Sequence, residues 1–140
     1  MNVAINAAMT RSSQLLRRAF VADAVFSGVA AVLLTADADA FAALLELPHG
    51  LLREAGLFLI AYTALVGWLG ARVAVPRALA VLVIAGNAAW TIGSIALLFS
   101  GAVSPNLLGQ VFVAGQAIAT GVFAELQYLG LRRSVAAVAA

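Results

Sequence analysis

The sequence predicts an all-α integral membrane protein, a four-helix transmembrane bundle in which residues 1–140 form a single transmembrane domain. The prediction rests on the hydrophobic composition, on four long apolar runs and on the placement of the arginines. Of the 140 residues, 64% are hydrophobic and only 10% are charged, and the mean hydropathy is +1.07. A soluble domain carries about 25% charged residues, which keep its surface hydrated. We therefore expect most of the surface of this chain to face lipid.

The apolar runs have the length and pattern of membrane-spanning helices. Only helices and closed barrels satisfy all their backbone polar groups in hydrocarbon, and a barrel would require alternating polar and apolar residues. No such alternation occurs in these runs. About 20 residues are needed to cross a hydrocarbon core of about 30 Å. The expected spans are residues 19–36, 53–72, 78–99 and 107–131, the last of them opened by Pro105 and Asn106.

A short helix is expected between the first two spans, over residues 39–47. Asp37 or Asp39 would cap its N-terminus, and Pro48 would end it. We predict that this helix lies at the outer membrane interface. An ordinary loop whose apolar residues dip into the bundle is the open alternative. The apolar residues on one side of the helix would be Phe41, Leu44, Leu45 and Leu47.

The arginines predict the orientation of the chain in the membrane. Short loops rich in arginine stay in the cytoplasm. The opposite loops carry four acidic residues and one basic residue, Arg53. Both termini are therefore predicted to be cytoplasmic (N-in, C-in). The seven other arginines precede the first span, separate the second from the third, or follow the fourth: Arg11, Arg17, Arg18, Arg72, Arg77, Arg132 and Arg133.

The first apolar run also resembles a cleavable signal peptide. Arg17 and Arg18 precede it, and small residues at Ala36 and Ala38 follow it. We favour a retained first span, because acidic Asp37 beside the small residues weakens this cleavage site.

The composition argues against several classes of function. The chain has no cysteine, which excludes disulfides, thiolate nucleophiles and cysteine-ligated metals. His49 is the only histidine and is expected to be a solvated loop residue rather than a metal ligand. The motifs of nucleotide-binding proteins and common hydrolases are absent. We therefore expect no enzyme, no metal and no cofactor. The net charge of +2 is too small and too dispersed to indicate a nucleic-acid partner.

Polar residues within the expected spans are candidates for a functional site, because they are costly in hydrocarbon. Asp23 follows Arg18 by five residues, and Glu125 precedes Arg132 by seven. At about 1.5 Å per residue, both carboxyl groups would lie about 7–10 Å from the cytoplasmic end of the bundle. A polar pocket that opens to the cytoplasm is expected from five residues: Asp23, Asn87, Trp90, Gln116 and Glu125.

Two interpretations of the carboxyl groups stay open. In the functional one, Asp23 or Glu125 handles protons or cations. In the structural one, they form ion pairs that fasten helix ends at the membrane interface. The partners in that case would be Arg18 or Arg72 for Asp23, and Arg77 or Arg132 for Glu125.

Trp90 lies near the middle of its span, away from the interfaces where tryptophan is enriched. Its indole N–H needs a partner, either Ser94 or a polar group of another helix. With Asn87 and Thr91 these residues form a polar stripe, which favours packing between helices over a ligand site. Gln116, also near mid-span, is expected to bond to another helix or to a second copy.

Three stretches of the sequence resemble a family of small, uncharacterised four-span proteins of the bacterial inner membrane. They are Leu45-Glu-Leu-Pro-His-Gly-Leu-Leu-Arg-Glu-Ala-Gly-Leu-Phe-Leu, Asn87-Ala-Ala-Trp90 and Ala124-Glu-Leu-Gln-Tyr-Leu-Gly-Leu-Arg132-Arg. The similarity extends over most of the chain. The resemblance implies an inner-membrane location and four spans, and it supplies no catalytic residues.

Two functions are consistent with these observations. The first is a non-enzymatic binding or accessory bundle for a lipid, a small hydrophobic ligand or a partner protein. The second is an oligomeric transporter or channel in which Glu125 and Asp23 line a path from the cytoplasm; four short helices rarely enclose such a path alone. The expected partners are therefore the lipid bilayer and either a second copy or another membrane protein.

Overall fold

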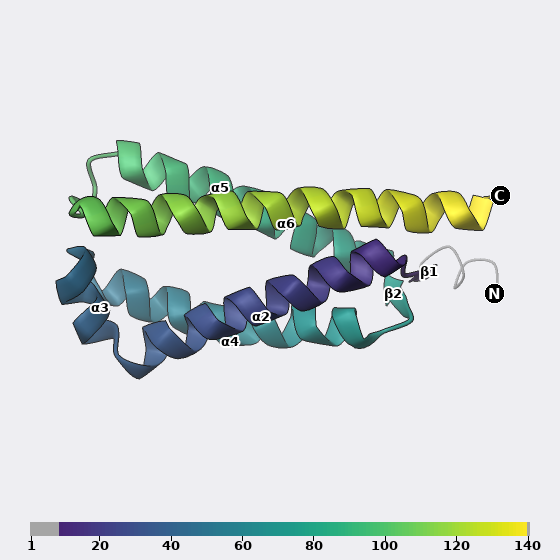
Figure 1. Ribbon diagram of the computed structural model, residues 1–140, viewed down its shortest axis with the longest axis horizontal. Coiled ribbons are helices and arrows are strands. Elements are labelled where there is room, and N and C mark those ends of the chain that lie inside the picture. The colour runs from purple at the N-terminus through teal and green to yellow at the C-terminus, as the bar shows by residue number, and fades with distance from the viewer. Residues whose placement is uncertain (1–8, 140) are drawn as a thin grey trace.

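The computed structural model describes residues 9–139, and within that range it contains four long helices and one short helix. The long helices are α2 (Gln14–Ala36), α4 (His49–Ala71), α5 (Arg77–Phe99) and α6 (Leu107–Ala139). They run side by side along the length of the molecule (Figure 1). Each is long and apolar enough to cross a membrane. The predictions of a helical fold and of four long apolar helices are thus confirmed.

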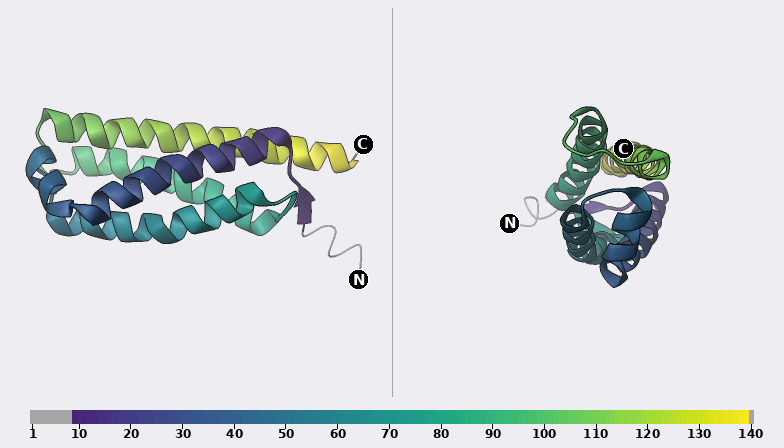
Figure 2. Two further views of the ribbon diagram at one scale, coloured as in Figure 1. Left: turned by 60° about the horizontal axis from the view of Figure 1, so that its bottom comes forward. Right: turned by 90° about the vertical axis from the view of Figure 1, so that its left-hand side faces the viewer.

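The long helices associate as two pairs. Helix α2 packs along α4, α5 packs along α6, and α2 also contacts α6. The end view in Figure 2 shows α2 and α4 on one side of the molecule and α5 and α6 on the other. Glycines allow α4 to approach α2 closely, since a Cβ atom at Gly56 would lie 2.9 Å from the Cβ of Leu34.

Helices α2 and α6 are fastened together near the two chain ends. A Cβ atom at Gly130 would lie 2.7 Å from backbone atoms of Leu16, so the two backbones almost touch. The Ser13 hydroxyl caps α2 by accepting from the Leu16 N–H, and it donates to the Gly130 carbonyl at 2.8 Å. Ser134 donates to the same carbonyl and accepts from the Ser13 N–H. These bonds hold the start of α2 against α6.

Two short strands were not expected from the sequence. Strand β1 (Met9–Arg11) pairs antiparallel with β2 (Ala74–Pro76), with Thr10 opposite Val75. Three residues per strand are too few to produce a readable alternation of apolar and polar side chains. The pair joins the segment before α2 to the connection between α4 and α5.

The expected short helix is present as α3 (Ala38–Leu45). The Asp37 carboxylate caps it by accepting from the Ala40 N–H at 3.0 Å, and Glu46 ends it in the left-handed conformation. Leu45 is buried, but Leu44 is 54% exposed and does not share the buried side as expected.

Asn106 opens α6, as the sequence predicts. Its side chain accepts from the Gly109 N–H at 2.8 Å. The same side chain donates to the Leu44 carbonyl at 2.9 Å. The start of α6 is thereby tied to the end of α3.

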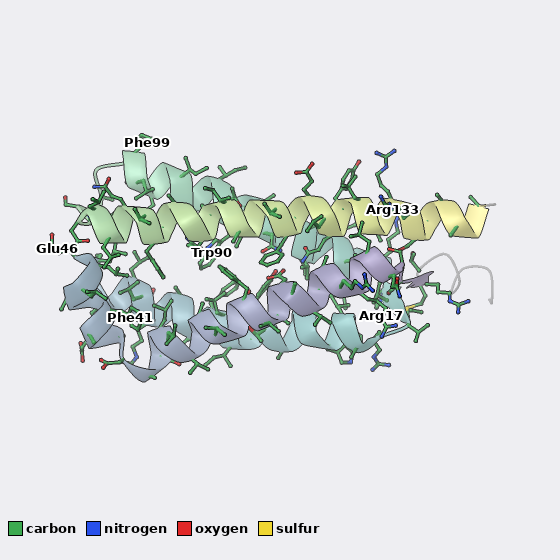
Figure 3. All side chains as sticks on the ribbon, viewed as in Figure 1. Arg17, Phe41, Glu46, Trp90, Phe99 and Arg133 are labelled. Carbon is green, nitrogen blue, oxygen red and sulfur yellow. The ribbon has the colours of Figure 1, made fainter. Side chains whose placement is uncertain are left out.

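The surface and the core have the distribution expected of helices that face lipid. Large apolar side chains are exposed along the outer faces, among them Val32, Ile92 and Ile118, and soluble monomers rarely expose such extensive apolar area. Figure 3 shows Arg17 and Arg133 towards one end of the helices and Phe41 and Glu46 at the other.

The buried apolar residues form two clusters along the helices. The first gathers around the N-terminal half of α2 and the C-terminal half of α4: Leu16, Phe20, Val66, Leu69, Val75, Ala80, Val83 and Leu131. The second lies beside α3: Leu34, Leu45, Leu47, Leu52 and Val113. Polar side chains occupy the region between these clusters.

Candidate functional site

Asp23 is the centre of a hydrogen-bond network to which all four long helices contribute. Its side chain, on α2, is fully buried. One carboxylate oxygen, Oδ2, accepts three hydrogen bonds, and the other, Oδ1, accepts one. The donors to Oδ2 are the Tyr62 hydroxyl (2.7 Å), Asn87 Nδ2 (2.8 Å) and Gln127 Nε2 (2.7 Å), and the donor to Oδ1 is the Ser27 hydroxyl (3.0 Å). We call these five residues the Asp23 network.

The Asp23 network is closed by a bond between two of its donors. Asn87 Nδ2 also donates to Gln127 Oε1, at 3.1 Å, which joins α5 to α6 beside the carboxylate. Buried polar groups are stable when hydrogen-bonded, and here the carboxylate has four donors around its two oxygens. The arrangement therefore joins all four long helices through polar contacts inside a mostly apolar interior.

The expected ion pair between Asp23 and Arg18 or Arg72 is absent. Within residues 9–139, the one close contact between a basic and an acidic side chain is that of His49 Nε2 with Asp39 Oδ1, at 3.4 Å. Asp23 points to the centre of the helices, whereas both arginines are exposed. The Arg72 guanidinium instead lies over the Trp68 ring, 4.4 Å from its centroid.

Glu125 lies outside the Asp23 network. Its side chain is exposed on α6, and in the described part of the chain it pairs with neither Arg77 nor Arg132. Two residues along a helix turn the side chain by about 200°. Gln127, two residues on, is therefore the α6 residue that reaches Asp23. The sequence does show that Gln127 is a polar residue within a predicted span, but Gln127 was not among the predicted site residues.

A second polar group links α5 to α6 beyond the Asp23 network. Trp90 Nε1 donates to Gln116 Oε1, and Gln116 Nε2 donates to the Ser94 hydroxyl at 2.9 Å. The Thr91 hydroxyl donates to the Ala117 carbonyl at 2.9 Å. Trp90 thus has a partner on another helix rather than Ser94, and the polar stripe of α5 bonds across to neighbouring helices.

The five residues expected to form one pocket are therefore divided. Asp23 and Asn87 meet in the Asp23 network, Trp90 and Gln116 meet in the second group, and Glu125 belongs to neither. Residues of the Asp23 network and of the second group nevertheless line one and the same cavity.

The cavity lies between the α2–α4 pair and the α5–α6 pair and has a volume of about 1130 Å³. Its polar wall includes Ser27, Tyr62 and Asn87 from the Asp23 network. Ligand pockets are mostly apolar with a few placed polar groups, as this cavity is, and measure about 300–1,000 Å³. This cavity is slightly larger and is partly open, since Val29 and Phe58 of its lining are exposed. Figure 3 shows Trp90 in the space between the two helix pairs. Apolar side chains form most of the lining, among them Val25, Phe26, Val29, Leu59, Phe112 and Phe123.

Helices α4 and α5 form the looser side of this cavity. They are not among the helix pairs in extensive contact. We call the boundary between α4 and α5 the seam. Aromatic rings meet across it: Phe58 of α4 stacks on Trp90 of α5, with centroids 5.6 Å apart and planes inclined by 10°. Phe58 is itself exposed. The seam faces the side of the molecule, where a bilayer would lie.

The described part of the chain contains no cluster of three or more His, Asp or Glu side chains that could hold a metal ion. No protein-family model matches the chain, and no curated protein or solved structure is significantly similar to it. The resemblance to a four-span bacterial family therefore stays a prediction, and a proposal of function has to rest on the geometry of the cavity and the Asp23 network.

Proposed function

We propose that this protein is a non-enzymatic, four-span protein of the bacterial inner membrane that binds a lipid or another hydrophobic ligand between its two helix pairs. The observation that carries the proposal is the cavity of about 1130 Å³, apolar over most of its lining and polar at the Asp23 network. An apolar space of this size at the middle of lipid-facing helices suits an apolar chain, and the polar wall suits a head group.

The seam between α4 and α5 supports entry of the ligand from the bilayer. Because Phe58 and Trp90 meet there through side chains, rotation of one ring opens the seam without separating closely packed backbones. On the side of α2 and α6, the cavity wall includes an edge-to-face contact between the rings of Phe26 and Phe123, whose centroids are 5.6 Å apart.

The same proposal places both termini in the cytoplasm. It is supported by the arginine-rich segments before α2, between α4 and α5, and late in α6. Reporter fusions after Arg77 and Arg133 should be active in the cytoplasm, and a fusion after Ser104 should be active in the periplasm. A reversed result at any site would contradict this orientation.

Two glycines of α5 offer a matched test of ligand binding. Gly86 lines the cavity, Gly93 does not, and a Cβ atom at either position would meet nothing within 4 Å. Gly86→Phe should place an aromatic ring in the cavity beside its polar wall and obstruct the ligand, whereas Gly93→Phe adds the same ring outside the cavity.

The measurement is the amount of hydrophobic ligand that is extracted from purified protein. We expect about one ligand per chain for the wild type and for Gly93→Phe, and at least a tenfold loss for Gly86→Phe. Equal ligand content in the two variants, or no ligand in any of them, would overturn the proposal.

A second candidate function is the oligomeric transporter or channel, and the observation that favours it is the exposed carboxylate of Glu125. A charged group that faces lipid is costly, and contact with a second copy would remove that cost. Liposomes that contain the protein should then show an ion or solute flux that Glu125→Gln reduces. Unchanged flux in that variant would exclude this function.

A further inference from the structure

We propose that the cavity selects an amphiphile whose head group donates hydrogen bonds, such as a long-chain alcohol, over one whose head group only accepts them. The inference rests on the proposed function, because it names the ligand class of the same cavity. It follows from how the hydrogens of the polar wall are used.

Two hydroxyl groups of the polar wall have no hydrogen left for a ligand. A serine or tyrosine hydroxyl carries one hydrogen and can also accept. The Ser27 hydroxyl donates to Asp23 Oδ1 at 3.0 Å, and the Tyr62 hydroxyl donates to Asp23 Oδ2 at 2.7 Å. Both residues line the cavity. Towards a ligand, each can therefore only accept.

Asn87, the third polar residue of this wall, likewise has no hydrogen left to donate to a ligand. Its two N–H hydrogens are used by Asp23 Oδ2 and Gln127 Oε1. Its carbonyl oxygen, Oδ1, makes no hydrogen bond within residues 9–139. The side chain is 97% buried, given its 3% exposure, and it lines the cavity. The oxygen is not fully enclosed, since only Ser12 Oγ and Thr63 Oγ1 are buried side-chain atoms without a partner in the described part of the chain. It is therefore a free acceptor that a donor in the cavity can reach.

The electrostatics of the wall agree with this count. Asp23, behind the three acceptors, has no cationic partner in the described part of the chain. The acceptor oxygens that face the cavity favour the positive end of a ligand dipole, such as a hydroxyl or ammonium hydrogen, and this attraction is strong in a low-dielectric interior. An ether or ester head group would place another acceptor against Asn87 Oδ1 and leave both unpaired.

The lining also indicates how the ligand lies. From Tyr62 the cavity continues along α4 as far as Leu51, eleven residues earlier, through mostly apolar side chains. At about 1.5 Å per residue, this stretch is about 16 Å long. The head group therefore lies at Asn87, and the apolar chain extends towards α3.

The two tryptophans of the chain allow a direct test. Trp90 lines the cavity, while Trp68 does not and lies under the Arg72 guanidinium. In the variant Trp68→Phe, Trp90 is the only tryptophan, and its fluorescence reports on the cavity. The probes are a long-chain alcohol brominated in its chain, the methyl ether of that alcohol, and the corresponding primary ammonium.

We expect the alcohol to quench Trp90 at a concentration at least tenfold lower than the methyl ether. An ammonium probe that outcompetes the alcohol would identify a protonated amine as the donor and would also support the inference. Equal potency of alcohol and ether would overturn the inference while leaving the proposed function standing. Absence of quenching by all three probes would instead count against the proposed function.

A matched pair of tyrosine variants, made in the Trp68→Phe background, separates the polar wall from general effects. Tyr62→Phe removes one acceptor of the wall and should reduce the preference for alcohol over ether at least threefold. Tyr128→Phe, on the exposed face of α6, should leave that preference unchanged. An equal preference in the two variants would overturn the assignment of the head group to this wall.

Discussion

Asp23 and Gln127 stand 104 residues apart in the chain and are joined by a hydrogen bond of 2.7 Å between Gln127 Nε2 and Asp23 Oδ2. The same oxygen accepts from Tyr62 and Asn87, so one atom of α2 holds the other three long helices. The bond lies between two apolar clusters. It therefore fastens the helices at the level where the cavity interrupts their packing.

Replacement of the central carboxylate should destabilise the fold. Asp23→Asn turns an oxygen that accepts hydrogen bonds into an amide that donates them, facing donors from other helices. We expect a loss of about 1–3 kcal/mol in the free energy of unfolding, the typical effect of unpaired buried donors. Denaturant titration in detergent measures it. Asp39→Asn, at an exposed position, is the control and should change stability by less than about 0.5 kcal/mol.

The two polar residues of α6 should respond differently to substitution. Gln127→Leu removes a bond to Asp23 and should cost about 0.6–2 kcal/mol, as interhelical hydrogen bonds in membranes do. Glu125→Gln alters an exposed side chain and should leave the unfolding free energy unchanged. The same titration compares them. A larger loss for Glu125→Gln than for Gln127→Leu would contradict the finding that Gln127, and not Glu125, faces the centre of the bundle.

Gly130 lies where α2 and α6 approach closely and Gly115 does not, so replacement by alanine should change stability in opposite directions at these two glycines. A methyl group at Gly130 would lie 2.7 Å from the Leu16 backbone, so Gly130→Ala should destabilise by about 1–3 kcal/mol through overpacking. At Gly115 nothing lies within 4 Å, and Gly115→Ala should stabilise by up to about 1 kcal/mol through helix propensity. Thermal unfolding distinguishes the two signs, and equal shifts would contradict this contact.

The pairing of β1 with β2 predicts a cross-link in a chain that has no natural cysteine. Thr10 and Val75 are directly opposite, and Cα atoms of opposite residues in antiparallel strands are about 4.5–5.5 Å apart, within disulfide range. Thr10→Cys with Val75→Cys should oxidise to an intramolecular disulfide, seen as a gel shift that a reductant reverses. Thr10→Cys with Ala102→Cys should not. A cross-link in the second pair alone would refute the pairing.

The four long helices and several of their ends could be predicted because hydropathy and capping are local properties. Asp37 before α3 and Asn106 before α6 carry side chains that bond to the first turn of their own helix. The β1–β2 pair could not be predicted, because strands of three residues produce no readable pattern and depend on a partner more than 60 residues away.

The side of the helix on which a polar residue lies was harder to predict than its position along the helix axis. A helix that is apolar on all sides gives little indication of which side faces its neighbours, since lipid and protein interior favour similar side chains. Depth alone placed Glu125 beside Asp23, but the phase of α6 places Gln127 there instead. Asn87 donates to Asp23, and the expected arginine partners of Asp23 do not pair with it because its carboxyl group points inward.

The central claim is that the cavity between the two helix pairs holds a hydrophobic ligand. Intact-mass measurement of the protein released gently from native membranes tests it most directly, because a bound ligand appears as added mass. The wild type and Gly93→Phe should carry the same single adduct, and Gly86→Phe should lack it. Wild-type protein without any adduct, or Gly86→Phe with the full wild-type adduct, would contradict the claim.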